Sequence, residues 1–229
     1  IVHLFNYVEL GEQEMKKKFM CLMVVMFIYG ISQASVVDQI QQEYDLSWLV
    51  ICSDWSFAQT FTAGMSGQLE KIDLYLDNIS ISVSDLYPST VSIVNVIDNV
   101  PSGSVLGQIY AENLTAGFNS INFLSESVFL AANVQYGIVL SNNDSEKYEG
   151  ISTQWRCKSS DVYGGGSLWS YTNGQWTQTV TPPNGGFTET FYGKDAAFRT
   201  YMVPEPITFS LLGLGAVMLR KKKFFRIDY

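Results

Sequence analysis

Hydrophobic and polar residues alternate along several short stretches of the chain, and this period of two predicts β-strands. In residues 69–76, LEKIDLYL, the side chains of Ile72, Leu74 and Leu76 fall on one face, and Lys71 lies on the other. β-Branched residues are frequent in two further runs, 90–96 and 134–141. Shorter runs occur at 58–64, 120–124 and 195–202, with Gly, Asn, Ser and Pro between the runs.

Strands of this length, separated by turn residues and without a long stretch of helical period, are typical of two packed sheets. We therefore expect an all-β fold, an antiparallel β-sandwich of jelly-roll type, over residues 35–202. Helix is expected only at the two hydrophobic ends of the chain. The alternating patterns predict a core that contains Ile72, Leu74, Leu76, Val91, Ile93, Ile138, Leu140 and Phe198.

The densest local signal is SLWSYTNGQWTQTV, residues 167–180. Asn173-Gly174 between alternating runs predicts a hairpin with a type I′ turn. Tyr171 would then pair with Trp176, Thr172 with Gln175, and Trp169 with Gln178. Trp169, Tyr171 and Trp176 would share one face. Because the other face is mostly polar, we expect the aromatic face to pack into the core; the alternative is an exposed face that stacks on sugar rings.

The chain ends in a short apolar segment, Ile207–Leu219, followed by the basic cluster Arg220, Lys221, Lys222 and Lys223. As a helix the segment would be roughly 20 Å long, which is marginal against a hydrocarbon layer of roughly 30 Å. A C-terminal amphipathic or core helix is the alternative, although no polar face interrupts the apolar run. The basic cluster would stay on the cytoplasmic side during export.

Residues 15–34 have the three parts of a secretory signal peptide. Lys16–Lys18 are followed by the apolar run Phe19–Ile31, and Ser32-Gln33-Ala34 predicts cleavage after Ala34. Residues 1–14 fit neither the signal peptide nor the fold. We expect them to derive from untranslated sequence upstream of Met15.

The two ends together resemble one sorting system. Val203, Pro204, Glu205 and Pro206, followed by the apolar segment and the basic cluster, resemble the PEP-CTERM sorting signal of bacterial exosortase substrates. The resemblance covers residues 203–226 of the segment 203–229, and the tail FFRIDY extends beyond the pattern. It implies that a membrane-embedded exosortase processes the chain near the motif, after which the protein is released or transferred to the surface or matrix. More loosely, residues 58–76 and 195–202 resemble the β-sandwich ectodomains that often carry such tails.

Charge narrows the set of partners. Residues 35–202 contain six basic and seventeen acidic residues, a net charge of −11, whereas the whole chain has −8. Such a surface repels the phosphates of nucleic acids and of anionic lipids. We therefore expect no nucleic-acid partner, and membrane contact only through the C-terminal segment before processing.

Cysteine use agrees with export. Once Cys21 leaves with the signal peptide, Cys52 and Cys157 remain, and an oxidising compartment favours a disulfide between them. The bridge would stabilise the fold by roughly 4 to 5 kcal/mol through the long loop that it closes. Two separately buried thiols are the alternative.

The sequence offers little for catalysis. The only histidine, His3, lies in the leader, so triads and zinc sites that need histidine are not expected in the mature protein. YGGGS, residues 163–167, is glycine-rich but precedes a predicted hairpin rather than a helix. We expect no enzyme and no cofactor, with one weak candidate for Ca²⁺ in the oxygen-rich loop of Asn142, Asp144 and Glu146.

Two functions remain open on the sequence. The first is a non-catalytic surface or matrix protein that is exported, sorted by an exosortase and associated with exopolysaccharide. The second is a carbohydrate-binding module that uses the aromatic residues of the 167–180 hairpin. An outward aromatic face beside amide or acidic side chains would favour the second function.

Overall fold

The computed structural model describes residues 34–51, 56–78, 88–142, 153–180, 189–190 and 194–205. They belong almost entirely to one compact unit, Ser35–Glu205. The expected signal peptide and the sorting helix with its basic cluster lie outside the described residues and stay predictions. Within the described ranges, no helix is long and apolar enough to cross a membrane.

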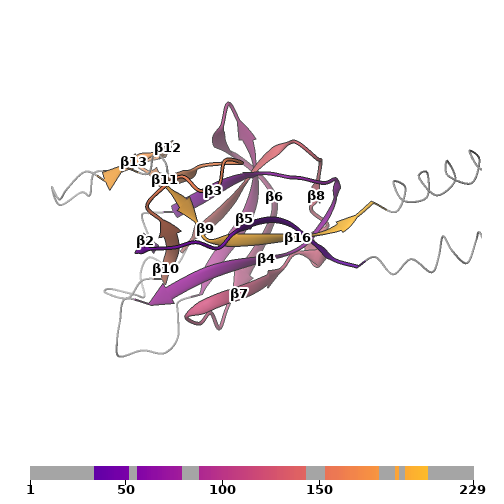
Figure 1. Cartoon of the computed structure of the whole chain (residues 1–229), viewed down its shortest axis with the longest axis horizontal. Coiled ribbons are helices and arrows are strands. Elements are labelled where there is room, and N and C mark those ends of the chain that lie inside the picture. The colour runs from indigo at the N-terminus through magenta and orange to yellow at the C-terminus, as the bar shows by residue number, and fades with distance from the viewer. Residues whose placement is uncertain are drawn as a thin grey trace, which may run out of the picture. The chain divides into compact units, whose positions relative to one another are not determined.

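The unit is built from two large antiparallel sheets (Figure 1). The eight-stranded sheet has the order β1-β16-β4-β10-β15, with β2 paired to β10 and with β7 and β8 paired to β4. Its strands are β1 (Val36–Gln41), β2 (Leu46–Ile51), β4 (Gly67–Asn78), β7 (Gly117–Asn122), β8 (Phe129–Leu130), β10 (Thr153–Lys158), β15 (Asp195–Ala196) and β16 (Phe198–Pro204).

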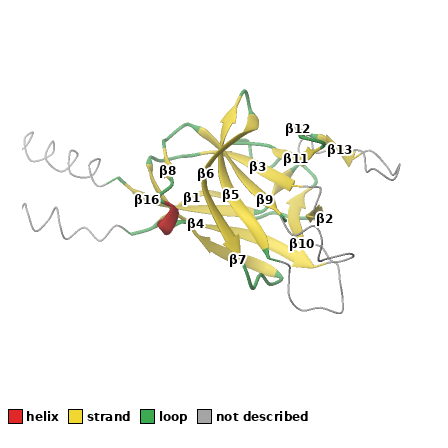
Figure 2. Cartoon of the chain, turned by 180° about the vertical axis from the view of Figure 1, so that it is seen from behind, coloured by secondary structure: helices red, strands yellow, loops and turns green. Residues whose placement is uncertain are grey.

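The six-stranded sheet has the order β12-β11-β3-β9-β5-β6, and its long strands β5 and β6 are seen in Figure 2. Its strands are β3 (Ser56–Thr62), β5 (Ser89–Ile97), β6 (Val100–Ala111), β9 (Gln135–Ser141), β11 (Leu168–Thr172) and β12 (Gln175–Thr177). A separate short pair joins β13 (Thr179–Val180) to β14 (Glu189–Thr190), and η1 (Leu124–Glu126) is a single 3₁₀ turn.

The core fills the space between the two large sheets, as expected for a β-sandwich. Phe61 of β3 and Phe198 of β16, one from each sheet, have ring centroids 6.0 Å apart. The predicted core is confirmed, because all eight residues named from the sequence are fully buried: Ile72, Leu74, Leu76, Val91, Ile93, Ile138, Leu140 and Phe198. Alternation alone therefore located the inner faces of both sheets.

A β-bulge keeps the apolar residues of β4 on the inner face. Tyr201 of β16 pairs with Lys71, but its neighbour Met202 pairs with Leu69, so Glu70 is an extra residue. A one-residue insertion reverses which side chains face the core. Leu69 and Ile72, three residues apart, are consequently both buried.

The last strand runs into the residues that resemble a sorting motif. Val203 pairs with Gln68 and Pro204 with Gly67, so β16 ends inside the motif. Proline donates no hydrogen bond and is tolerated at the end of a strand. Glu205 follows directly, and Pro206 lies outside the described residues.

Candidate functional site

The predicted hairpin of β11 and β12 is present. Asn173 and Gly174 have φ values of +53° and +81°, as a type I′ turn requires. Tyr171 pairs with Trp176 and Thr172 with Gln175, as expected. The ring centroids of Tyr171 and Trp176 are 5.1 Å apart.

The expectation that the aromatic face packs into the core is wrong. β11 pairs with β3 so that Leu168 and Ser170 point between the sheets, where both are fully buried. Trp169 and Tyr171 alternate with them and therefore point outward. Tyr171 is 39% exposed, and Trp169 is partly buried.

The outward rings rest on a small apolar patch of the outer face of the six-stranded sheet. Trp169 and Trp176 pack against Ala58, Val94 and Val139, which form a cluster separate from the main core. The apolar face of each ring is thus supported by the sheet, while the hairpin edge remains accessible to solvent.

A pocket of about 490 Å³ opens beside Trp169. Its lining combines one aromatic ring with amide, hydroxyl and backbone groups, and none of its residues is charged. The lining residues are Thr62, Asn99, Gln135, Gly164, Gly165, Gly166, Ser167, Trp169 and Gln178. The indole Nε1 of Trp169 is buried and has no hydrogen-bond partner among the described residues.

The glycine loop forms a fixed wall of this pocket. Thr60 N donates to Ser167 O (2.9 Å), and Ser167 N donates to Thr60 Oγ1 (2.7 Å). Thr62 Oγ1 donates to Gly165 O (2.8 Å). Gly166 lies so close to the Thr60 carbonyl that a Cβ atom would overlap it. The loop is therefore tied to β3 at three points.

Sequence reasoning identified Trp169 and the hairpin but missed the amide groups. Asn99 lies in the turn between β5 and β6, where its φ is +65°, and Gln135 begins β9. These residues come from segments far apart in the chain, and no spacing joins them. The glycine run at 164–166 was the one feature of the sequence that pointed to this pocket. In the structure, the absence of a side chain at Gly166 allows the loop to approach β3 closely.

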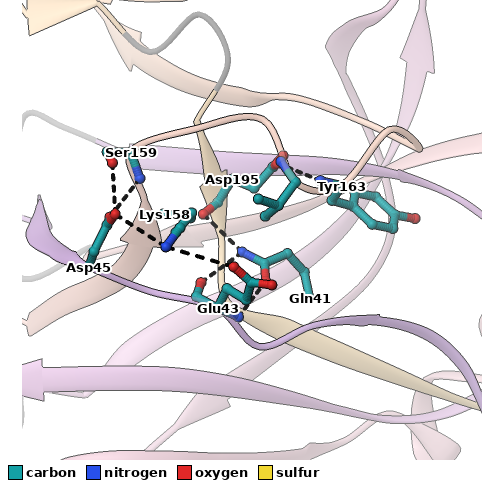
Figure 3. Close-up of polar contacts among 8 residues, drawn as sticks. Gln41, Glu43, Asp45, Lys158, Ser159, Tyr163 and Asp195 are labelled. Atoms are coloured by element: carbon teal, nitrogen blue, oxygen red, sulfur yellow. Dashed lines mark hydrogen bonds and ion pairs between the residues drawn. The ribbon is translucent and has the colours of Figure 1, made fainter.

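A second polar cluster surrounds the buried carboxylate of Asp195 (Figure 3). Its Oδ2 accepts hydrogen bonds from the backbone N–H groups of Val162 (2.9 Å) and Tyr163 (2.8 Å). Its Oδ1 accepts one from Gln59 Nε2 (3.2 Å). Burial raises the pKa of Asp195, against the lowering effect of these hydrogen bonds. With 1% exposure, the group fixes the 161–163 loop and has no access to a substrate.

Nearby ion pairs tie the loop after β1 to β10. Lys158 Nζ lies 3.3 Å from Asp45 Oδ2 and 3.7 Å from Glu43 Oε2. Ser159 N also donates to Asp45 (2.7 Å). The charge of Lys158 is therefore balanced by two carboxylates, as Figure 3 shows.

The remaining predicted sites are only partly covered. Asn142 follows β9 and is 9% exposed, but Asp144 and Glu146 lie outside the described residues. Over the part of the chain that is described, no three His, Cys, Asp or Glu side chains are grouped to hold a metal ion. Cys157 is buried in the core, and Cys52 lies outside the described residues, so the disulfide stays a prediction.

No protein-family model matches the chain, and no curated protein matches it significantly. Solved structures that match include the cysteine protease and lectin-like domains of Cwp84, a surface layer associated protein of Clostridium difficile, with 13% identity and a TM-score of 0.46. A second is the clostridial cysteine protease Cwp84 after propeptide cleavage, with 14% identity and a TM-score of 0.46. Both matches cover 75% of this chain but only 36% and 40% of the matched chains. A likeness of this size assigns neither a family nor an activity.

Proposed function

We propose that this chain is an exported, non-catalytic protein of the cell surface or extracellular matrix whose β-sandwich, of jelly-roll type, binds exopolysaccharide. The binding site is the outward face of Trp169, Tyr171 and Trp176 together with the adjoining pocket. An exosortase and the secretion machinery deliver the protein, on the resemblance of its two ends to that system. No cofactor takes part.

The observation that carries the proposal is the outward orientation of the aromatic face beside neutral hydrogen-bonding groups. Sugar rings present apolar C–H faces, which pack on aromatic rings, and hydroxyl groups, which need donors and acceptors at their edges. Trp169 supplies the ring, and Asn99, Gln135 and Gln178 supply amides at the pocket wall. A few placed polar groups around an apolar surface are typical of small-molecule sites.

The absence of charge in the pocket lining selects among saccharides. The lining side chains are amides, hydroxyls and one indole. An acidic sugar would bring a carboxylate into a site without a cation and would lose hydration without compensation. We therefore assign neutral sugar units to this site.

Trp169→Ala is expected to weaken binding of the whole chain to its host's exopolysaccharide at least about tenfold. The reason is that a central aromatic anchor contributes more than about 1.4 kcal/mol to such an interface. The free energy of unfolding should fall by only about 1 to 2 kcal/mol, because the ring of Trp169 is already partly exposed in the folded protein. Isothermal titration with purified polysaccharide and a thermal melt measure the two effects.

Phe129→Ala is the matched control, since Phe129 is 54% exposed and lies on β8 of the other sheet. It should bind as the unchanged protein does. Equal binding by the Trp169→Ala variant and the unchanged protein would overturn the proposed site.

Processing of the tail is a separate expectation. The mature protein from its native host should lack residues 207–229, because exosortase processing would remove the apolar segment and the basic cluster. Intact-mass spectrometry of the surface or matrix fraction measures this. A mass that still includes residues 211–226 would mean that the tail is a simple anchor.

A further inference from the structure

The outer face of the eight-stranded sheet combines basic side chains with aromatic rings. Pairing places Tyr201 opposite Lys71, and Tyr75 opposite Phe118. Lys71 and Tyr75 alternate with the buried Ile72 and Leu74 and so point away from the core. Their partners Tyr201 and Phe118 lie on the same face of the sheet. We call this surface the cationic face, and its residues are Lys71, Arg156, Arg199, Tyr44, Tyr75, Phe118 and Tyr201.

Each cation of this face lies against a ring. The guanidinium carbon of Arg199 is 4.1 Å from the ring centroid of Phe118, and Lys71 Nζ is 4.2 Å from that of Tyr201. Arg156 lies 5.8 Å from the Tyr44 ring. Attraction to the ring faces holds the three charges at the surface of the sheet.

The rings themselves form a continuous group. Tyr44 stacks on Tyr75 with centroids 4.5 Å apart, and Tyr75 meets Phe118 edge-on at 4.8 Å. Tyr44 is 42% exposed and Phe118 38% exposed. A partly exposed group of three aromatic rings thus adjoins the cations.

Asp73 fixes this arrangement from beneath. It is 5% exposed and accepts hydrogen bonds from Tyr201 Oη (2.8 Å) and from Ser120 Oγ. Arg199 Nη1 lies 3.6 Å from its Oδ2. The carboxylate therefore orients Arg199 without presenting its own charge to solvent, and such pre-organisation lowers the cost of binding.

The charge of this face contrasts with that of the unit around it. Residues 35–202 carry a net charge of −11, yet three of their six basic residues lie here. Arg156 is paired with Asp77, whereas Lys71 has no carboxylate within ion-pair distance among the described residues. With its three cations and the two carboxylates of Asp73 and Asp77, the face carries a net charge of +1 on a strongly acidic protein. Among the described residues its unpaired cation is Lys71, which therefore favours an anionic partner.

We propose that the cationic face is a second saccharide site that binds an anionic polysaccharide. Carboxylates of the polymer would meet Lys71 and Arg199, while its sugar rings lie on Tyr44 and Phe118. Exposed Ile40 of β1, opposite Arg199, extends the apolar surface. This site lies on the other sheet from the Trp169 pocket, so each can be tested without the other.

The test compares polygalacturonate with its fully methyl-esterified form, which has the same sugar backbone but neutral esters in place of the carboxylates. The whole chain, in detergent micelles, should bind polygalacturonate and not the ester, and added salt should weaken the binding. Lys71→Gln should reduce the affinity about two- to five-fold, the size expected for one exposed ion contact. Lys71→Gln combined with Arg199→Gln, the second cation that would meet the polymer, should reduce it further. Melting curves verify that both variants fold.

Lys158→Gln is the matched control, because it removes the same charge from a side chain already balanced by Asp45 and Glu43. It should bind as the unchanged protein does, and so should Trp169→Ala. Equal loss in Lys158→Gln and Lys71→Gln would mean unspecific charge attraction and overturn the proposal. Equal binding of the ester would overturn it too. So would sedimentation of a dimer that polygalacturonate neither binds nor dissociates.

Discussion

Trp155→Ala is expected to lower the free energy of unfolding by about 4 kcal/mol, because it removes a large side chain from the core. Trp155 is fully buried on β10 and is the bulkiest fully buried side chain among the described residues. Its removal leaves a cavity in a tightly packed interior. Its indole Nε1 also donates to the carbonyl of Ala197 (2.9 Å), which would lose this partner.

Chemical unfolding of the unchanged protein and of Trp155→Phe separates these two causes. Phenylalanine keeps most of the apolar volume but cannot donate a hydrogen bond to Ala197. Trp155→Phe should therefore lower the free energy of unfolding by less, about 1 to 2 kcal/mol. Equal stability of Trp155→Ala and the unchanged protein would contradict the assigned core.

Gly166→Ala is expected to lower the free energy of unfolding by about 3 kcal/mol and to abolish binding at the Trp169 pocket. A Cβ atom at this position would overlap the backbone carbonyl of Thr60. The loop would have to leave β3, and the hydrogen bonds between Thr60 and Ser167 would break. The pocket wall moves with the loop, so stability and polysaccharide binding should fall together.

Gly103→Ala, on β6 and outside the pocket lining, is the matched control. A Cβ atom there meets nothing within 4 Å, so the melting temperature and the affinity should stay close to those of the unchanged protein. If both glycine variants behaved alike, the close approach of the loop to β3 would not be what shapes the pocket. Thermal melts and titration with neutral polysaccharide measure both quantities.

The fold class and the inner faces of the strands could be predicted from the sequence alone. Successive side chains of a strand point to opposite faces, so hydrophobic residues at every second position mark the buried face. The pattern named buried residues of β4, β5 and β9 without error, and it named the turn at Asn173-Gly174. It did not identify β6 or β10 as strands. In β10, TQWRCK, the polar residues Gln154, Arg156 and Lys158 occupy the outer positions, and a strand of only six residues gives a weak pattern.

The outward face of the hairpin, by contrast, depends on how the strands assemble. Alternation separates two faces, but it does not say which one meets the core. Pairing of β3 with β11 places Leu168 and Ser170 between the sheets and leaves the tryptophans on the outer patch. A polar residue such as Ser170 is tolerated inside because its hydroxyl donates to Thr177 O (3.2 Å).

The two candidate sites also depend on tertiary structure, because each joins residues that the chain keeps far apart. Asn99, Gln135 and Trp169 meet at one pocket only because β11, β3, β9 and β5 are neighbours, in that order, in one sheet. Arg199, Asp73 and Phe118 meet because β16 and β7 flank β4. Which strands pair over such separations depends on the packing of the whole core. Local sequence patterns therefore predict strands, whereas the two sites form only when the sheets have assembled.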